Sequence, residues 1–337
     1  MSKTKNTEGI SPIELYLRSL SVSQLREMVQ HHMIKKSKTL KRNALYKYIQ
    51  ENGLIPKQLQ VSSSKPDAGF LEYERNSCYL DSFLTCFVLA KPSWFKVHVC
   101  EASLAHHTDE LLKAAAVQIQ KELCEVYKSL VVTKTTYKCR ALRKYFRVFD
   151  DLYKPGHPEE WTSTQTDPNA VVEILNRVFK FPETIEIDGM GSREYSGITV
   201  YPSQDRGEAL HLKSVLPITR DWIADQKRYH MVHYLKADFL YVNVLRNLDD
   251  LHKNDSPVIP ETRLEFTENT KPLQLKSVII HDGITPHSGH YNAILRLKGR
   301  WYYYDDMTVG RYKYLGRDFK KLFNESLSRN CVGFFYA

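Results

Sequence analysis

Helical and strand-like patterns occupy different parts of residues 70–337, and this separation restricts the possible folds more than any other feature. Apolar residues at helical spacing predict helices within 109–130 and 169–179. From residue 185 onward the apolar runs are strand-like, namely 239–245, 275–281, 291–297, 301–304 and 332–336. Helices followed by antiparallel strands are typical of α+β domains. We therefore predict an α+β fold.

The first 69 residues have a different organisation. Apolar spacing predicts two short helices between Ser11 and Gly53, joined by a basic turn that begins at Lys35. Residues 55–69 contain two prolines and three consecutive serines, a composition typical of a linker. We therefore predict a helical domain over 1–54, a linker over 55–69 and a second domain over 70–337.

Positive charge is concentrated in the N-terminal segment. Residues 1–60 hold eleven Lys or Arg against four Asp or Glu, which accounts for +7 of the chain's net +9. Such a balance suits phosphate backbones or acidic surfaces. The segment LSVSQLREMVQHHMIKKSKTLKRNALYKYIQENGL resembles a SAP domain, a helix-turn-helix module, which implies DNA as a partner. The candidate phosphate contacts are Lys35, Lys36, Lys38, Lys41 and Arg42. A helical hairpin with a solvated lysine-rich face is the alternative.

Composition narrows the class and the compartment. With 42% hydrophobic and 26% charged residues, the chain has an ordinary globular composition. The longest apolar run, 79–90, is too short to span a bilayer, and the N-terminus lacks the apolar stretch of a secretory signal. We expect an intracellular protein, in the nucleus or cytoplasm. The six cysteines form no C-x-x-C pair, so we expect free thiols, no metal site and no cofactor.

Cys78 stands at the start of a predicted helix. In RNSCYLDSFLTCFVLAKPSW, apolar residues at three-and-four spacing predict a helix that ends before Pro92. The free amides and the positive dipole end of a first turn stabilise a thiolate. Asn76 and Ser77 are suitable caps for this helix. The alternative for a lone cysteine is a buried structural thiol, which is how we interpret Cys86.

Two segments together resemble ubiquitin-specific proteases. NSCYLDS is similar to the cysteine box of that family, usually NxGNTCYMNS, and HDGITPHSGHYNAILRLKGRWYYYDD is similar to its histidine box. The boxes occur in the family's order, and His290 follows Cys78 by 212 positions. The resemblance implies a papain-like cysteine protease fold with a helical thumb, an antiparallel-sheet palm and reduced fingers without zinc. It also implies hydrolysis after the C-terminal glycine of ubiquitin, with Cys78 as nucleophile.

The histidine box contains more than one candidate base. The family's GHY motif matches Gly289, His290 and Tyr291, and therefore selects His290 over His281 and His287. A glycine at this place leaves room for a substrate backbone beside the base. With Cys78 as its partner, His290 would act as general base and acid.

Strand geometry bears on the choice of the orienting acid. A two-residue turn at Lys298 and Gly299 would place Asn292 opposite Asp305, with His290 on the same face. Asp306 would then point away. A three-residue turn would exchange the two acids, since a one-residue slip reverses the faces. The family pattern W-x-x-x-D also selects Asp305.

Further roles follow from the resemblance. TSTQTDPNAVVEILNRVF is similar to the family's QQDAxEFL box, which implies that Gln165 and Asp167 hold the ubiquitin tail, although Asp167 before a proline is also a helix cap. Gly289 and Tyr291 would flank the cleft. Tyr73 stands where the family has its oxyanion asparagine, so Asn76 and Asp306 are candidates for an oxyanion or second-acid role.

Two other functions fit the same residues. A catalytically weak or inactive scaffold that binds ubiquitin would explain the missing oxyanion asparagine. A protease for another ubiquitin-like modifier would use the same nucleophile and base. The sequence leaves both alternatives open.

Overall fold

The computed structural model describes residues 66–337 apart from 156–160, 162–166, 183–184, 188–190, 194–196, 203–208, 213–217, 224–225, 235–237, 247–251, 266–271, 286–287 and 309–311. The chain divides into two compact units, 1–64 and 65–337. The expected SAP-like domain and most of the expected linker lie outside the described residues. In the described part, no helix is both long and apolar enough to cross a membrane.

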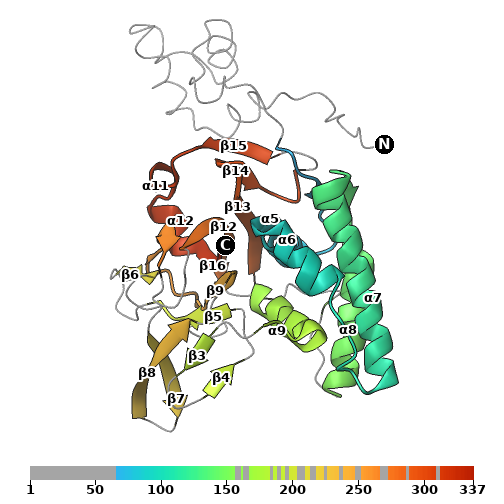
Figure 1. Ribbon diagram of the computed structural model, residues 1–337. Helices are drawn as coiled ribbons and strands as arrows, with labels where there is room; N and C mark the ends of the chain where they lie inside the picture. Colours follow the sequence, from blue (N-terminus) through green and yellow to red (C-terminus); the bar gives the residue numbers. More distant parts are fainter. Residues whose placement is uncertain are drawn as a thin grey trace, which may run out of the picture. The chain divides into compact units, whose positions relative to one another are not determined.

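An eight-stranded sheet forms the centre of the second unit (Figure 1). Its strands run in the order β15, β14, β13, β12, β16, β9 and β5, and β11 pairs separately with β12. Their bounds are Gly197–Val200 (β5), Leu240–Val244 (β9), Arg263–Leu264 (β11), Leu273–Thr285 (β12), Ser288–Leu297 (β13), Arg300–Tyr304 (β14), Tyr312–Gly316 (β15) and Cys331–Tyr336 (β16). The five predicted strand runs correspond to β9, β12, β13, β14 and β16, and are confirmed.

The expectation of a wholly antiparallel palm is wrong in one place. β5 pairs with β9 in parallel, whereas the other ladders of this sheet are antiparallel. Parallel neighbours need a long connection between them. Here the connection is residues 201–239, which include further strands and return the chain to the same end of the sheet. The sheet is therefore mixed, within an α+β fold.

Five α-helices lie on one side of this sheet (Figure 1). They are α5 (Cys78–Ala90), α6 (Pro92–Phe95), α7 (Glu110–Tyr127), α8 (Arg140–Tyr153) and α9 (Pro168–Phe179), with the π-helical segments η1 (Lys96–Cys100) after α6 and η2 (Lys128–Val132) after α7. The three predicted helices are confirmed as α5, α7 and α9. α8 is an additional helix, which packs against α7.

The alternation of side chains along the strands divides the apolar core in two. Ile279 and Ala293 pack in a cluster with the helices, whereas their neighbours Ile280 and Ile294 pack in a second cluster on the other face. Phe319 of α11 (Phe319–Leu322) belongs to the second cluster, and Leu327 of α12 (Glu325–Asn330) packs against that cluster. Both faces of the sheet are thus buried, which fixes the strands that carry the histidine box.

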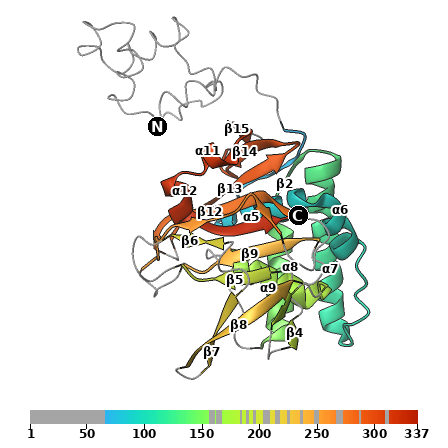
Figure 2. The ribbon, with the colours of Figure 1, turned by 60° about the vertical axis from the view of Figure 1, so that its left-hand side comes forward.

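Smaller strands complete the unit (Figure 2). β1 (Phe70–Leu71) pairs with β2 (Thr136–Tyr137), and β6 (Leu210–His211) pairs with β10 (Val258–Ile259). A separate sheet has the strand order β4, β3, β8 and β7, formed by Gly191–Arg193, Ile185–Ile187, Gln226–Tyr234 and Ile218–Ile223. Residues at the end of the expected linker already belong to the second unit, since the Gly69 amide donates to Leu130 O at 2.7 Å.

Candidate active site

Helix α5 carries Cys78 as its first residue and packs directly under β13. The Ser82 hydroxyl, one turn further along, donates to the backbone oxygen of Tyr291 at 3.0 Å. This bond joins the helix of Cys78 to the strand position next to His290. Two segments more than two hundred positions apart are therefore held against each other at the site.

The turn before Cys78 differs from the expected capping arrangement. Ser77 occupies the N-cap position, but its hydroxyl makes no bond to the helix amides and donates to the Asp81 carboxylate instead. Asn76 has a left-handed backbone, φ 61°, and its side-chain oxygen accepts from the Tyr73 hydroxyl at 3.2 Å. The expectation that Ser77 caps α5 through its side chain is therefore wrong, and Asn76 lies one residue before the N-cap. Their polar groups serve the turn and a buried carboxyl.

Arg143 of α8 forms hydrogen bonds with the backbone of the turn before Cys78. Its side chain is 4% exposed, and Nη1 donates to the backbone oxygens of Glu74 and Arg75 at 2.9 and 2.8 Å. Its Nε donates to the backbone oxygen of Trp161 at 2.5 Å. One guanidinium thus satisfies three carbonyls that irregular backbone leaves without partners. The position of the residues preceding Cys78 depends on this contact.

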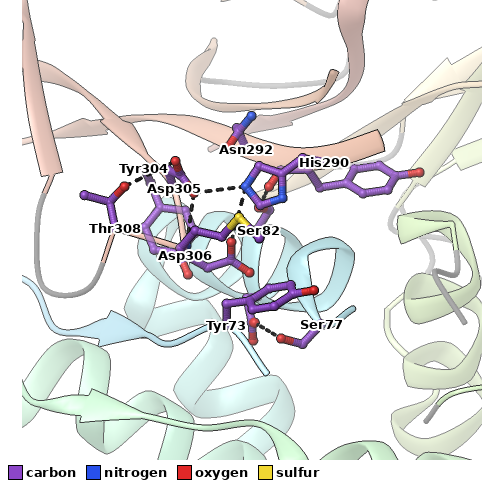
Figure 3. Close-up of polar contacts among 12 residues, drawn as sticks. Tyr73, Ser77, Ser82, His290, Asn292, Tyr304, Asp305, Asp306 and Thr308 are labelled. Carbon is purple, nitrogen blue, oxygen red and sulfur yellow. Dashed lines mark hydrogen bonds and ion pairs between the residues drawn. The ribbon is translucent and has the colours of Figure 1, made fainter. Parts of the chain in front are cut away.

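His290 lies between the thiol and a carboxylate (Figure 3). Its Nε2 is 2.9 Å from Asp305 Oδ1, and its side chain also forms a hydrogen bond with that of Cys78. Cys78 is 3% exposed, whereas the His290 side chain is 24% exposed. The imidazole is therefore more accessible to solvent than the thiol.

The hairpin between β13 and β14 has the predicted register. Leu297 pairs with Arg300 and Ala293 with Tyr304, as a two-residue turn requires. His290 and Asp305 accordingly meet at the end of this ladder. Asp305 is held in turn by the amide of Met307 at 3.0 Å and by the hydroxyl of Thr308 at 3.3 Å.

The expectation that Asp306 points away from the base is wrong. Its Oδ1 is 3.5 Å from His290 Nε2, and Figure 3 shows both aspartates on the same side of the ring. β14 ends at Tyr304 and the chain then turns, so the alternation of faces no longer applies to the next two residues. Two carboxyl groups, rather than one, face the imidazole.

The electrostatics of the site favour a charged imidazole. Burial lowers the pKa of His290, but the hydrogen bonds to Asp305 and Cys78 outweigh it and raise the pKa to about 10. For Asp305, burial acts to raise the pKa, and the bond from His290 together with the Met307 amide and Thr308 hydroxyl lowers it overall. An imidazolium beside a sulfur and an ionised aspartate is the arrangement that activates a cysteine nucleophile.

The other expected site residues have varied surroundings. Gln165 and His287 lie outside the described residues. Asp167 is the N-cap of α9 and accepts from the Asn169 amide at 2.8 Å, as its alternative role predicted. Tyr291 is 4% exposed and stacks on His281, with centroids 4.4 Å apart, so it does not flank an open cleft here. The expectation for Tyr291 was based on a motif, which carries no information about burial.

The backbone conformation at position 289 requires a glycine. Gly289 has φ 148°, and an added Cβ would lie 2.5 Å from Asp282 O and 2.8 Å from His281 Nε2. The space beside this glycine is therefore taken by the hairpin itself, not left open for a substrate as the sequence suggested. His281, 2% exposed, is buried at the same place, and burial lowers its pKa to about 4.

All six cysteines are free thiols. Cys86 is fully buried, and burial raises its pKa to about 12, which fits a structural thiol. In the described part of the chain, one group of side chains has the spacing of a metal site, and it consists of His290, Asp305 and Asp306 themselves. These are the base and the two acids of the site described above.

A cysteine, a histidine and an aspartate in contact are the groups of a thiol-dependent hydrolase. Residues 162–321, slightly less than half of the chain, match the family model of ubiquitin carboxyl-terminal hydrolase. The match includes His290, Asp305 and Asp306 but begins after Cys78. It supports the ubiquitin carboxyl-terminal hydrolase family, whose members are thiol-dependent ubiquitin hydrolases. No curated protein matches the chain significantly.

The basic limb of the pH–rate profile tests the charge on His290. Because the Asp305 contact helps to raise the pKa of His290 to about 10, the imidazolium persists through neutral pH. We expect kcat/KM to fall only as pH approaches about 10, and this limb to move to lower pH in Asp305→Asn. The free energy of unfolding changes with pH in the same direction. The stabilisation that His290 contributes is complete below the pKa of histidine in the unfolded chain, about 6.5, and is lost as pH rises through about 10. A limb at the same pH in both proteins would contradict this assignment.

Proposed function

We propose that this chain is a deubiquitinating cysteine protease that hydrolyses the isopeptide or peptide bond after the C-terminal glycine of ubiquitin. The observation that carries the proposal is the bridging position of His290, which bonds to Cys78 on one side and to Asp305 at 2.9 Å on the other. The family match makes ubiquitin the best-supported modifier.

The site contains a side chain for each step of the proposed reaction. The Cys78 thiolate attacks the carbonyl carbon of the terminal glycine, and the imidazolium of His290 gives its proton to the leaving amine. The resulting thioester is then attacked by water, whose proton His290 accepts. Collapse of the second tetrahedral intermediate releases the carboxylate of ubiquitin and restores the thiolate and the imidazolium. Asp305 keeps the ring oriented and stabilises its charge throughout.

We propose that the side chain of Asn76 donates a hydrogen bond to the oxyanion. It would take the role of the family's oxyanion asparagine, whose position is occupied by Tyr73 in this chain. The Tyr73 hydroxyl donates to the side-chain oxygen Oδ1 of Asn76 at 3.2 Å. The same hydroxyl accepts from the backbone amide of Asn76 at 3.0 Å. This pair fixes which end of the carboxamide is the acceptor, so Nδ2 is the end that can donate. The Cys78 backbone amide would be the second donor.

Asn76→Ala is expected to lower kcat by about 100-fold with little change in KM, because an oxyanion donor acts in the transition state and not on bound substrate. Tyr73→Phe, which leaves Asn76 present but less well oriented, should have a smaller effect in the same direction. Steady-state kinetics on a fluorogenic ubiquitin C-terminal amide measures both. A change in KM alone for Asn76→Ala would place this side chain in substrate binding instead.

For the substrate tail, we propose that Gln165 and Asp167 contact the extended C-terminal residues of ubiquitin. The cap bond from Asn169 uses one oxygen of Asp167. We also propose that the sheet of β3, β4, β7 and β8 acts as reduced fingers without zinc.

A panel of modifiers tests the substrate class. The full chain is incubated with fluorogenic C-terminal amides of ubiquitin and of other ubiquitin-like modifiers, and Cys78→Ala provides the blank. We expect ubiquitin to be the preferred substrate. Hydrolysis of a different modifier alone would support the second alternative derived from the sequence.

An inactive scaffold remains the rival, and one observation favours it: the Cys78 residue is only 3% exposed. Binding of ubiquitin without turnover, at equal affinity in the wild type and in Cys78→Ala, would support that reading. Against it, a scaffold has no need for a nucleophile, a base and an orienting acid in contact.

For residues 1–54 we propose DNA binding, which would tether the enzyme to DNA or chromatin inside the cell, in the nucleus or cytoplasm. The support is the net charge of +7 in residues 1–60 and the resemblance to a SAP domain. Affinity for duplex DNA should fall steeply with salt. Replacement of Lys35, Lys36 and Lys38 by glutamine should weaken it, whereas unchanged affinity would reject the assignment.

A further inference from the structure

Behind the catalytic groups lies a buried pair of carboxyl groups. Asp81 is in the first turn of α5, three residues after Cys78, and Asp306 follows Asp305. Both side chains are 0% exposed. Asp306 is the one whose Oδ1 lies 3.5 Å from His290 Nε2. The pair thus connects the nucleophile's helix to the base.

The two groups cannot both be ionised at reasonable cost. Asp81 Oδ1 and both carboxyl oxygens of Asp306 are buried from water and form no hydrogen bond of ordinary geometry with the described residues. His290 and the Met307 amide act on Asp306 only from farther away. Unpaired buried charge is expensive, and two adjacent carboxylates repel each other. A single proton shared by the pair removes the repulsion and supplies the missing donor.

Neighbouring groups indicate which carboxyl holds the proton. Asp81 accepts from the Ser77 hydroxyl and contacts the Cys139 thiol, and its contact with Asp306 is a hydrogen bond once one of them is protonated. Burial and the adjacent Asp306 raise the pKa of Asp81 well above its usual range. Burial raises that of Asp306 only to about 6, since the charge of His290 opposes it. The contacts point the same way: His290 Nε2 lies 3.5 Å from Asp306 Oδ1, so the imidazolium favours a charged Asp306. Asp81 faces the Ser77 hydroxyl and the Cys139 thiol instead of a cation, so the proton belongs to Asp81 at neutral pH.

The remaining ionisable groups that face the pair do not neutralise it. Cys139, before α8, and Tyr304, on β14, are both buried, and burial raises the pKa of each well above its usual value, so both are neutral. His290 and Asp305 face Asp306 from the cleft side. The cation that balances Asp306 is thus the imidazolium.

We propose that Asp81 is a protonated positioning residue, whose carboxylic acid donates a hydrogen bond to Asp306 and holds this second carboxylate beside His290. The inference rests on the proposed function, because it concerns the same site. The cysteine-box pattern quoted above has asparagine at this position, a side chain that donates without needing a proton. Asp81 performs the same task only while it is protonated.

Two substitutions of Asp81 distinguish a hydrogen-bond donor to Asp306 from a side chain that only packs at this place. Asp81→Asn keeps a donor toward Asp306 and an acceptor for Ser77, and we expect its kcat/KM at pH 7 to stay within about threefold of the wild type. Asp81→Leu has a similar size but no donor, and should lose about 10- to 100-fold, since it removes the hydrogen bond that Asp81 donates to the buried Asp306. In an Asp306→Ala background the Asp81→Leu loss should largely disappear.

A spectroscopic measurement detects the proton itself without ubiquitin. Infrared difference spectra of wild type minus Asp81→Asn at pH 7 should contain the carbonyl band of a buried carboxylic acid. Iodoacetamide alkylation of Cys78 serves as the second ubiquitin-independent readout, and thermal unfolding shows that each variant is folded. Absence of the band, or an Asp81→Asn variant that is folded but as impaired as Asp81→Leu, would overturn the proposal. Failure to cleave ubiquitin with the band present would reject the proposed function alone.

Discussion

His290→Ala is expected to lower kcat/KM on a ubiquitin C-terminal amide by at least about 10⁴-fold, because one imidazole serves as partner of the thiolate, acid for the leaving amine and base for water. The ring contacts Cys78 and lies 2.9 Å from Asp305, so no neighbouring group replaces it. Steady-state kinetics with a matched control, His211→Ala, measures the effect. His211 is exposed on β6, away from the Cys78–His290 contact, and its loss should leave the rate unchanged.

A second readout distinguishes the loss of a base from a loss of folding. His290→Ala should also slow the alkylation of Cys78 by iodoacetamide at neutral pH, since the thiolate loses its cationic partner. A His290→Ala protein that is folded and retains more than about a tenth of the wild-type rate would contradict the assigned role.

Arg143→Met is expected to have the largest effect on stability, about 3–5 kcal/mol, because it removes a buried guanidinium that donates to one buried and two partly buried carbonyls together. These carbonyls belong to Glu74, Arg75 and Trp161. Since two of them lie in the turn before Cys78, activity should fall with stability. Denaturant unfolding at 25 °C provides the measurement.

Arg140→Met is the matched control for that experiment. Arg140 lies on the same helix and pairs with the side chain of Glu74, but it is 74% exposed and the N–O distance is 3.8 Å. An exposed ion pair of this kind contributes little, so the change should stay within about 0.5 kcal/mol. Similar losses for both variants would show that Arg143 acts by its charge alone and not through the carbonyls.

The hairpin of the histidine box shows what could be predicted from the sequence. A two-residue turn at Lys298 and Gly299 fixes the pairing of every residue in the ladder, and the structure has this register. The contact between His290 and Asp305 followed from it. The two-residue turn and the alternation of side chains along a strand were sufficient to predict this contact, because the ladder of β13 and β14 is short and regular.

The same rule failed as soon as the strand ended. Asp306 was expected on the far side, yet the chain turns after Tyr304 and brings this residue to His290 as well. Alternation holds only where the backbone is extended. Arg143 and Asp81 were missed for a different reason, since their roles depend on contacts with residues distant along the chain. A charged residue within an apolar helix was the available signal for Asp81.

The measurement that tests the central claim most directly is covalent labelling by a ubiquitin carrying an electrophile at its C-terminus, with the modified residue located by peptide mass spectrometry. The account predicts one adduct, on Cys78, that is lost in Cys78→Ala and strongly reduced in His290→Ala. An adduct on another cysteine, or no adduct on the folded wild-type protein, would contradict it.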